Sequence, residues 1–131
     1  MMNTSQRGNM AEAAIILALT RIGRQVLIPF GDGCKFDLAY IDEDNKLIRV
    51  QCKTARYKFG CIHFNTATQT RGGKRVDYAG EADMFGVYYE PLDQCYLFPV
   101  IGAAKASQAL RIEPSKNNQA QGVLWAKEYT I

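Results

Sequence analysis

The sequence predicts an α/β fold in which a mixed β-sheet is flanked by helices, built as one domain over residues 1–131. The chain opens with an amphipathic helical pattern, and alternating patterns typical of β-hairpins follow it. The composition, with 47% hydrophobic and 22% charged residues, is that of a globular protein. A chain of 131 residues suits one hydrophobic core, so several domains are not expected.

The first element is predicted as a helix over residues 4–24. Apolar residues recur at spacings of three and four, at Ala11, Ala14, Ile15, Ala18, Leu19 and Ile22. Thr4 or Ser5 would cap this helix, and Gly23 stands where it would end. Glu12 falls at the border of the apolar stripe, so its carboxylate can point along the core. A solvated helix glutamate is the alternative interpretation.

Residues 36–41 and 46–53 are predicted as the two strands of a β-hairpin. A three-residue loop ending in a left-handed Asn45 would pair Asp42 with Lys46 and fix the register. A slip by one residue would move every side chain to the other face and is therefore disfavoured.

That register predicts the two faces of the hairpin. The apolar face gathers Phe36, Leu38 and Tyr40 opposite Cys52, Val50 and Ile48. On the other face Asp37 lies across from Gln51, with Lys53 two residues further along the same strand. The polar groups of the hairpin are therefore expected to collect on one side.

The remaining elements are predicted more coarsely. They are a short strand at 26–29, a basic loop after Lys53, a strand at 61–64, a long polar stretch at 65–75, a second hairpin at 84–89 and 94–100, a short helix at 103–110, a strand at 110–113 and a helical turn at 123–129. A polar stretch of that length in a small domain is usually functional or mobile.

The positive charge of the chain is concentrated in its middle. Between Asn45 and Val76 there are eight basic residues and no acidic one, although the whole chain has 16 basic and 13 acidic residues. Such asymmetry favours a polyanionic partner, of which nucleic acid is the commonest. A solvated basic loop without a partner is the alternative.

Other classes of protein are disfavoured. No apolar run approaches the roughly 20 residues that span a bilayer, and the first residues show no secretory signal pattern, so a cytoplasmic protein without a membrane partner is expected. The four cysteines form no CxxC pair and are expected to be reduced.

Four side chains suggest hydrolytic chemistry. Asp37, Gln51 and Lys53 share one face of the hairpin, and Glu12 projects from the helix that covers the sheet. Together they offer oxygen ligands of the kind that Mg²⁺ prefers, beside one ammonium group. That ammonium could orient a water molecule and offset the charge that builds on a phosphate under attack.

The order Glu12, Asp37 and Gln51-Cys52-Lys53 resembles the PD-(D/E)XK nuclease superfamily, and most closely its branch of bacterial group I intron homing endonucleases. The similarity continues through residues 78–85, 96–100 and 110–119, and so covers nearly the whole chain. It implies a restriction-endonuclease-like core of αβββαβ type.

The resemblance also implies roles for these residues. Glu12, Asp37, Gln51 and Lys53 would be catalytic. Asp37 and the backbone carbonyl of Cys52 would bind Mg²⁺, for which Mn²⁺ could substitute, and Glu12 would contact the metal through water. Gln51 stands where a second acid is usual, and a neutral amide is a poorer cation ligand, so one or two metals remain possible. Phe36 replaces a proline.

The implied function is a metal-dependent endonuclease that cuts double-stranded DNA, with a homing endonuclease as the most specific interpretation. Cutting both strands needs two active sites, so a homodimer or a dimer of dimers is expected. A junction-resolving nuclease and an inactive DNA-binding protein are the alternatives. The residues expected to contact phosphates or base edges are Arg49, Arg56, Lys58, Asn65, Thr68, Gln69, Arg71, Lys74 and Arg75.

The sequence offers two alternative sites. Cys34, Cys52, Cys61 and His63 could be imagined as zinc ligands, but their irregular spacing lacks the usual pairs. His63 could act as a general base, although a structural imidazole on a strand is the commoner case.

Overall fold

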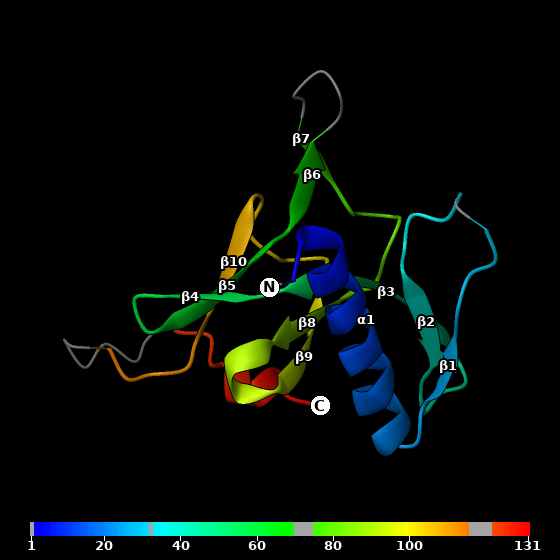
Figure 1. Ribbon diagram of the computed structural model, residues 1–131, viewed down its shortest axis with the longest axis horizontal. Helices are drawn as coiled ribbons and strands as arrows, with labels where there is room; N and C mark the ends of the chain where they lie inside the picture. Colours follow the sequence, from blue (N-terminus) through cyan, green and yellow to red (C-terminus); the bar gives the residue numbers. More distant parts are fainter. Residues whose placement is uncertain (1, 32, 70–74, 116–121) are drawn as a thin grey trace.

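A computed structural model of the chain describes residues 2–31, 33–69, 75–115 and 122–131. It confirms the α/β class with a central mixed sheet (Figure 1). The strands of this sheet, in spatial order, are β1 (Gln25–Leu27), β2 (Leu38–Ile41), β3 (Leu47–Thr54), β8 (Met84–Tyr89) and β9 (Gln94–Pro99). Within it β3 and β8 run parallel, and the other neighbours run antiparallel.

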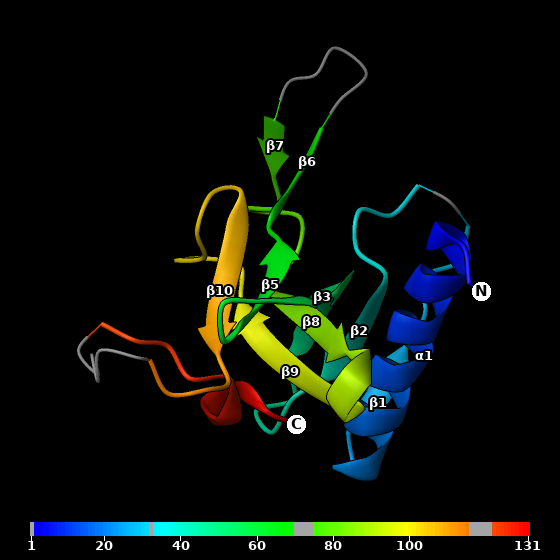
Figure 2. The same ribbon diagram turned by 60° about the vertical axis from the view of Figure 1, so that its left-hand side comes forward.

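Smaller elements complete the architecture. A three-stranded antiparallel sheet has the order β10 (Ser107–Arg111), β5 (Cys61–Asn65) and β4 (Arg56–Lys58). A two-stranded ribbon of β6 (Ala67–Gln69) and β7 (Arg75–Asp77) projects from the body of the molecule in both views (Figures 1 and 2). Two short 3₁₀ turns are η1 (Glu90–Leu92), between β8 and β9, and η2 (Ala126–Tyr129) near the C-terminus.

The predicted first helix is confirmed as α1 (Thr4–Arg21), which lies on one face of the central sheet (Figure 2). Its cap is Asn3 rather than Thr4 or Ser5, because Asn3 and Gln6 form a reciprocal capping box. Gly23, with a φ of 86°, follows the last turn as expected. Ala11, Ile15 and Leu19 are buried against the sheet, so the predicted apolar stripe is the face that packs.

The contact between α1 and the sheet depends on Gly86 in β8. A Cβ atom added there would lie 2.8 Å from Cγ1 of Val50 and 3.1 Å from Cγ2 of Ile15. Both neighbours are buried and β-branched, so neither can move aside without lifting the helix. The glycine therefore allows the close approach of helix and sheet.

We expect Gly86→Ala to lower the free energy of unfolding by about 1–3 kcal/mol through overpacking. Urea denaturation monitored by circular dichroism measures the change. Gly8→Ala is the matched control, because a Cβ at this exposed position of α1 meets nothing within 4 Å. That control should be neutral or stabilising, since alanine has the higher helix propensity. Equal stability of the Gly86→Ala variant and the wild type would contradict the close packing.

The register predicted for the first hairpin is confirmed. Leu38 pairs with Val50 and Tyr40 with Ile48, and the Asp42 N–H donates to the Lys46 carbonyl at 2.9 Å. Asn45 has a φ of 63°, which is the expected left-handed conformation. The second predicted hairpin is likewise confirmed as β8 and β9.

A second apolar core fills the space between the central sheet and the three-stranded sheet. Phe64 of β5 is fully buried there and makes edge-to-face contacts with Phe85 and Phe98, with ring centroids 5.6 and 6.0 Å apart. Val87, Ile62 and Leu110 complete its centre. The central sheet is therefore covered by a helix on one face and by strands on the other (Figure 2).

Three expectations for local structure were wrong. The helix expected at 103–110 does not form: residues 103–106 lie outside helices and strands, and residues 107–110 belong to β10, which pairs with β5 and buries Gln108 and Leu110 on one face. The basic loop after Lys53 contains β4, which pairs with β5. The described ends of the polar stretch at 65–75 form the β6–β7 ribbon with Arg75 to Asp77. The β10–β5 pairing joins residues that are distant in sequence, whereas β4–β5 and β6–β7 are local hairpins.

Among the described residues, no helix combines the length and the apolar character that crossing a bilayer requires.

Candidate active site

Asp37 lies where β2 begins, and its two hydrogen bonds fix it against β3. Its backbone N–H donates to the Val50 carbonyl at 2.9 Å, and its carboxylate Oδ2 accepts from the Cys52 N–H at 2.8 Å. The two bonds bracket Gln51, which the sequence placed across from Asp37. The aspartate is thereby held at the point where β3 loses its β2 neighbour.

The start of β2 differs from the prediction at Phe36. The alternation of the strand would place Phe36 on the face of Leu38, but Phe36 packs against the second core, on the opposite side of the sheet. Regular pairing begins at Leu38, and the side chain of Asp37 takes the place of a backbone carbonyl as acceptor for Cys52. The departure from strand geometry presents the carboxylate at the sheet edge.

The backbone of Cys52 faces the same edge. The N–H and C=O groups of one strand residue point to the same side of the strand. Since the Cys52 N–H meets the Asp37 carboxylate, the Cys52 carbonyl is directed toward this edge as well. The thiol lies on the α1 side, where burial, and then Asp37 and Glu12, raise its pKa. It is therefore uncharged at neutral pH.

Glu12 approaches this edge from α1. It is half-buried on the helix, next to the buried Ala11. Burial first, and the Asp37 carboxylate second, raise the pKa of Glu12 above its ordinary value. Two carboxylates that repel each other at a partly buried edge form a place where a cation is stabilised. The predicted position of Glu12 at the border of the apolar stripe is thus confirmed.

The raised pKa of Glu12 predicts a pH-dependent stability for the metal-free protein. The folded chain holds the proton of Glu12 more tightly than the unfolded chain, so ionisation opposes folding. This loss of folding free energy is absent at a pH below the pKa that Glu12 has in the unfolded chain. It is complete at a pH above the pKa that Glu12 has in the folded chain. We therefore expect Glu12→Gln to raise the melting temperature at pH 7 in EDTA, and to leave it unchanged near pH 3.

Glu128→Gln is the control for this measurement, because Glu128 is exposed on η2. It should leave the melting temperature unchanged at both pH values. A Glu12→Gln variant that melts no higher than the wild type at pH 7 would contradict the claim that burial and the charge of Asp37 destabilise the ionised Glu12.

Gln51 and Lys53 leave β3 on the other face of the sheet. Side chains alternate along a strand, and the neighbouring Val50 and Cys52 pack on the α1 side. The Lys53 ammonium donates to Oη of Tyr78 at 3.0 Å and lies 4.6 Å from the centre of that ring. Gln51 is half-buried. The candidate site therefore lies around the edge of β3. The two carboxylates and the Cys52 carbonyl lie at this edge, and the Lys53 side chain leaves the same strand on the opposite face of the sheet.

The donors at this edge suit a hard divalent cation. Asp37, Glu12 and the Cys52 carbonyl supply oxygen, and the mutual repulsion of the carboxylates would fall when a cation binds. Within the described ranges, no three His, Cys, Asp or Glu side chains gather into a metal-binding group. A cation here would thus rely on two carboxylates and a backbone oxygen, and keep water on its remaining positions.

The residues predicted to contact DNA are divided among several elements. Arg56 and Lys58 are exposed on β4, and Asn65 is exposed at the end of β5. Thr68, Gln69 and Arg75 lie on the β6–β7 ribbon. Arg71 and Lys74 lie outside the described residues. Figure 1 shows β4 and the ribbon projecting in different directions.

Arg49 has a structural partner. Its Nε and Nη2 donate to the two carboxylate oxygens of Asp83 at 3.0 Å each, and its Nη1 donates to the Gly80 carbonyl at 2.9 Å. The same interaction raises the pKa of Arg49 and lowers that of Asp83. The guanidinium therefore binds the turn before β8 through Gly80 and Asp83.

The two alternative sites gain no support from the geometry. All four cysteines are free, and Cys34 is exposed on the loop before β2, whereas Cys52 is within the sheet. His63 lies in β5 with its Nε2 3.3 Å from the Lys58 carbonyl oxygen, inside the β4–β5 hairpin. Its imidazole therefore contacts the hairpin backbone.

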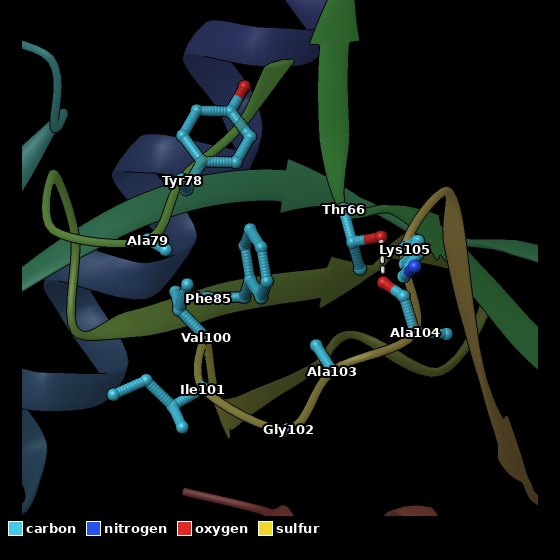
Figure 3. Close-up of a pocket in the computed structure, with 10 residues that line it drawn as sticks. All are labelled: Thr66, Tyr78, Ala79, Phe85, Val100, Ile101, Gly102, Ala103, Ala104 and Lys105. Atoms are coloured by element: carbon cyan, nitrogen blue, oxygen red, sulfur yellow. Dashed lines mark hydrogen bonds between the residues drawn. The ribbon is translucent and has the colours of Figure 1, made fainter. Parts of the chain in front are cut away.

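Tyr78 is the residue of this site that the sequence analysis missed. It lies between β7 and β8, outside any predicted element, and contacts Lys53. The only signal for it was its place at the start of the matching segment 78–85. Figure 3 shows its ring above Phe85 at a cavity of about 500 Å³, with the hydroxyl pointing away from that cavity.

Comparison with known proteins identifies the family and the fold. The family model described as PD-(D/E)XK endonuclease matches residues 2–131. A solved structure, the bacterial homing endonuclease I-Ssp6803I, is similar at a TM-score of 0.76 and 25% sequence identity, covering 98% of this chain and 89% of that one. A search of curated protein sequences finds no match. The chain belongs to the PD-(D/E)XK endonuclease family, and its fold is restriction-endonuclease-like.

Proposed function

We propose that this protein is a site-specific DNA endonuclease that depends on a divalent metal, with Mg²⁺ as the working ion and Mn²⁺ as a substitute. The observation that carries the proposal is the edge of β3, where Asp37 bonds to the Cys52 N–H and repels Glu12. Membership in an endonuclease family supports the reaction, and the similarity to a homing endonuclease supports a homing role.

In this proposal each residue of the site has a stated task. Asp37 and the Cys52 carbonyl hold the cation directly, and Glu12 holds it through water. The cation supplies Lewis-acid stabilisation of the phosphate under attack. Lys53 orients the attacking water and donates hydrogen bonds to the phosphate oxygens as negative charge builds on them. Gln51 offers an amide oxygen and an N–H₂ group to the substrate, without adding a third negative charge.

The β6–β7 ribbon supports recognition of duplex DNA. A two-stranded ribbon fits the major groove, where base pairs can be distinguished. The ribbon projects from the body and continues from β5 (Figure 2). Arg56 and Lys58 on β4 would add phosphate contacts that carry no sequence information.

Assembly is the second part of the proposal. The described part of the chain carries one such site, and cutting both strands needs two, so we propose a homodimer or a dimer of dimers. Light scattering after size-exclusion chromatography, with and without DNA, measures the mass. A monomer in both conditions would contradict this part.

The function is tested with plasmid DNA that carries the sequence flanking the insertion point of this protein's own gene. We expect discrete products in Mg²⁺ or Mn²⁺ and none in EDTA. Cutting of four-way junctions regardless of sequence would instead support a junction-resolving nuclease. Binding of DNA without cutting in any divalent metal would show a DNA-binding protein that has lost catalysis.

A further inference from the structure

The contact between Lys53 and Tyr78 restrains the one ammonium group of the site. Lysine has a long flexible side chain, and leaving it free would spread its ammonium over many positions. Here Nζ donates one hydrogen bond to Oη of Tyr78 at 3.0 Å, which leaves two N–H donors for other groups. The hydroxyl is neutral, so it fixes the position of the ammonium without cancelling its charge.

Tyr78 is itself held firmly. Its side chain is only 8% exposed, and its ring packs edge-on against Phe85 with centroids 5.7 Å apart. The Tyr78 carbonyl accepts from the N–H groups of Glu81 and Ala82 at 3.0 and 3.1 Å, which closes a tight turn. Figure 3 shows this ring standing against Phe85. The hydroxyl therefore has a defined place over β3.

Arg49 ties that turn to the strand that carries Lys53. The guanidinium holds the Gly80 carbonyl and the Asp83 carboxylate, and the Arg49 N–H also donates to Asp83 Oδ2 at 2.8 Å. In return the Asp83 N–H donates to the Arg49 carbonyl at 2.9 Å. Lys53 is part of β3, and Arg49 attaches the turn that follows Tyr78 to the same strand. The backbone of β3 therefore positions both residues of the Lys53–Tyr78 contact.

From this geometry we propose that Tyr78 is a positioning residue for Lys53, placing its ammonium for the reacting phosphate and water. The inference rests on the proposed function, because the position of the Lys53 ammonium matters only if the site hydrolyses a phosphodiester. It assigns the turn from Tyr78 to Asp83 a role in the site, and it gives Arg49 a task that needs no DNA contact.

Tyr78→Phe tests the proposal, since it removes the hydroxyl and keeps the ring. At saturating DNA and Mg²⁺ we expect the single-turnover cleavage rate to fall roughly 10–100-fold, the loss that follows when a hydrogen bond to a charged group is removed. The DNA dissociation constant, measured in Ca²⁺, should stay within about twofold, because Tyr78 is buried away from solvent. Purely structural damage would lower binding and stability together.

Tyr57→Phe is the matched control, because the hydroxyl of Tyr57 on β4 also donates to a side chain, to Glu113 Oε2 at 3.0 Å, and this bond does not involve Lys53. Its cleavage rate should equal that of the wild type. A readout without catalysis follows the Lys53 ε-methylene by NMR relaxation in the metal-free protein. We expect this group to be ordered in the wild type and in Tyr57→Phe, and mobile in Tyr78→Phe.

The outcomes separate the two proposals. If the wild type cuts DNA and Tyr78→Phe cuts it equally fast, the positioning role is wrong and the nuclease function stands. Unchanged order of the Lys53 ε-methylene in Tyr78→Phe overturns the role as well. If the wild type cuts no DNA, the proposed function is wrong, and the catalytic use of the contact falls with it.

Discussion

Replacing Lys53 by methionine should slow DNA cleavage roughly 10²–10³-fold while DNA binding stays nearly unchanged. Methionine keeps an unbranched side chain of similar length but carries no charge, so the donors to the phosphate and the water are lost. Removing one such electrostatic contact costs roughly 10²–10³-fold in rate. Single-turnover cleavage in Mg²⁺ and DNA affinity in Ca²⁺ measure the two effects separately.

Asp37→Asn should have the same result by a different cause. Asparagine keeps an oxygen that can accept from the Cys52 N–H, so the start of β2 is preserved, but the charge that holds the cation is gone. Two controls match these changes: Lys127→Met, whose ammonium lies over the Trp125 ring, and Asp44→Asn in an exposed turn. Both should cut like the wild type. Full activity in either site variant would remove that residue from the mechanism.

Phe64→Ala should produce the largest loss of stability. The ring is fully buried between the two sheets, and it contacts both Phe85 and Phe98. Deleting a buried phenylalanine ring usually costs about 3–5 kcal/mol, because the cavity collapses only in part. Urea denaturation monitored by circular dichroism gives the change in the free energy of unfolding.

Phe59→Ala is the matched control on the same hairpin. Phe59 is 83% exposed at the turn between β4 and β5, and its removal should change stability by less than about 0.5 kcal/mol. If both variants lost the same stability, the packing of the three-stranded sheet on the central sheet would be wrong. A large loss in Phe64→Ala alone supports it.

The parts of the fold that follow local patterns could be predicted from the sequence. The helix is strongly periodic, and the register of the first hairpin follows from a three-residue turn ending in Asn45 and from two apolar faces. These features set where Glu12 and Asp37 lie. Each depends on residues close in sequence, so periodicity and turn chemistry were sufficient.

The parts that depend on distant pairing could not be predicted. Residues of β10 were expected in a helix, although their pairing with β5 makes them a strand. The Phe36 side chain was placed on the wrong face because the Asp37 carboxylate, rather than a backbone group, accepts from Cys52. The Lys53–Tyr78 contact joins residues 25 positions apart, which no local pattern reveals.

The central claim is that a divalent cation binds at the edge of β3, held by Asp37 and the Cys52 carbonyl beside Glu12. Crystals of the Lys53→Met variant with DNA and Mn²⁺, measured at the manganese absorption edge, locate the ion by its anomalous signal. The account predicts a peak within coordination distance, about 2.0–2.4 Å, of an Asp37 carboxylate oxygen and the Cys52 carbonyl oxygen. A peak elsewhere, or no peak in crystals that contain bound DNA, would contradict it.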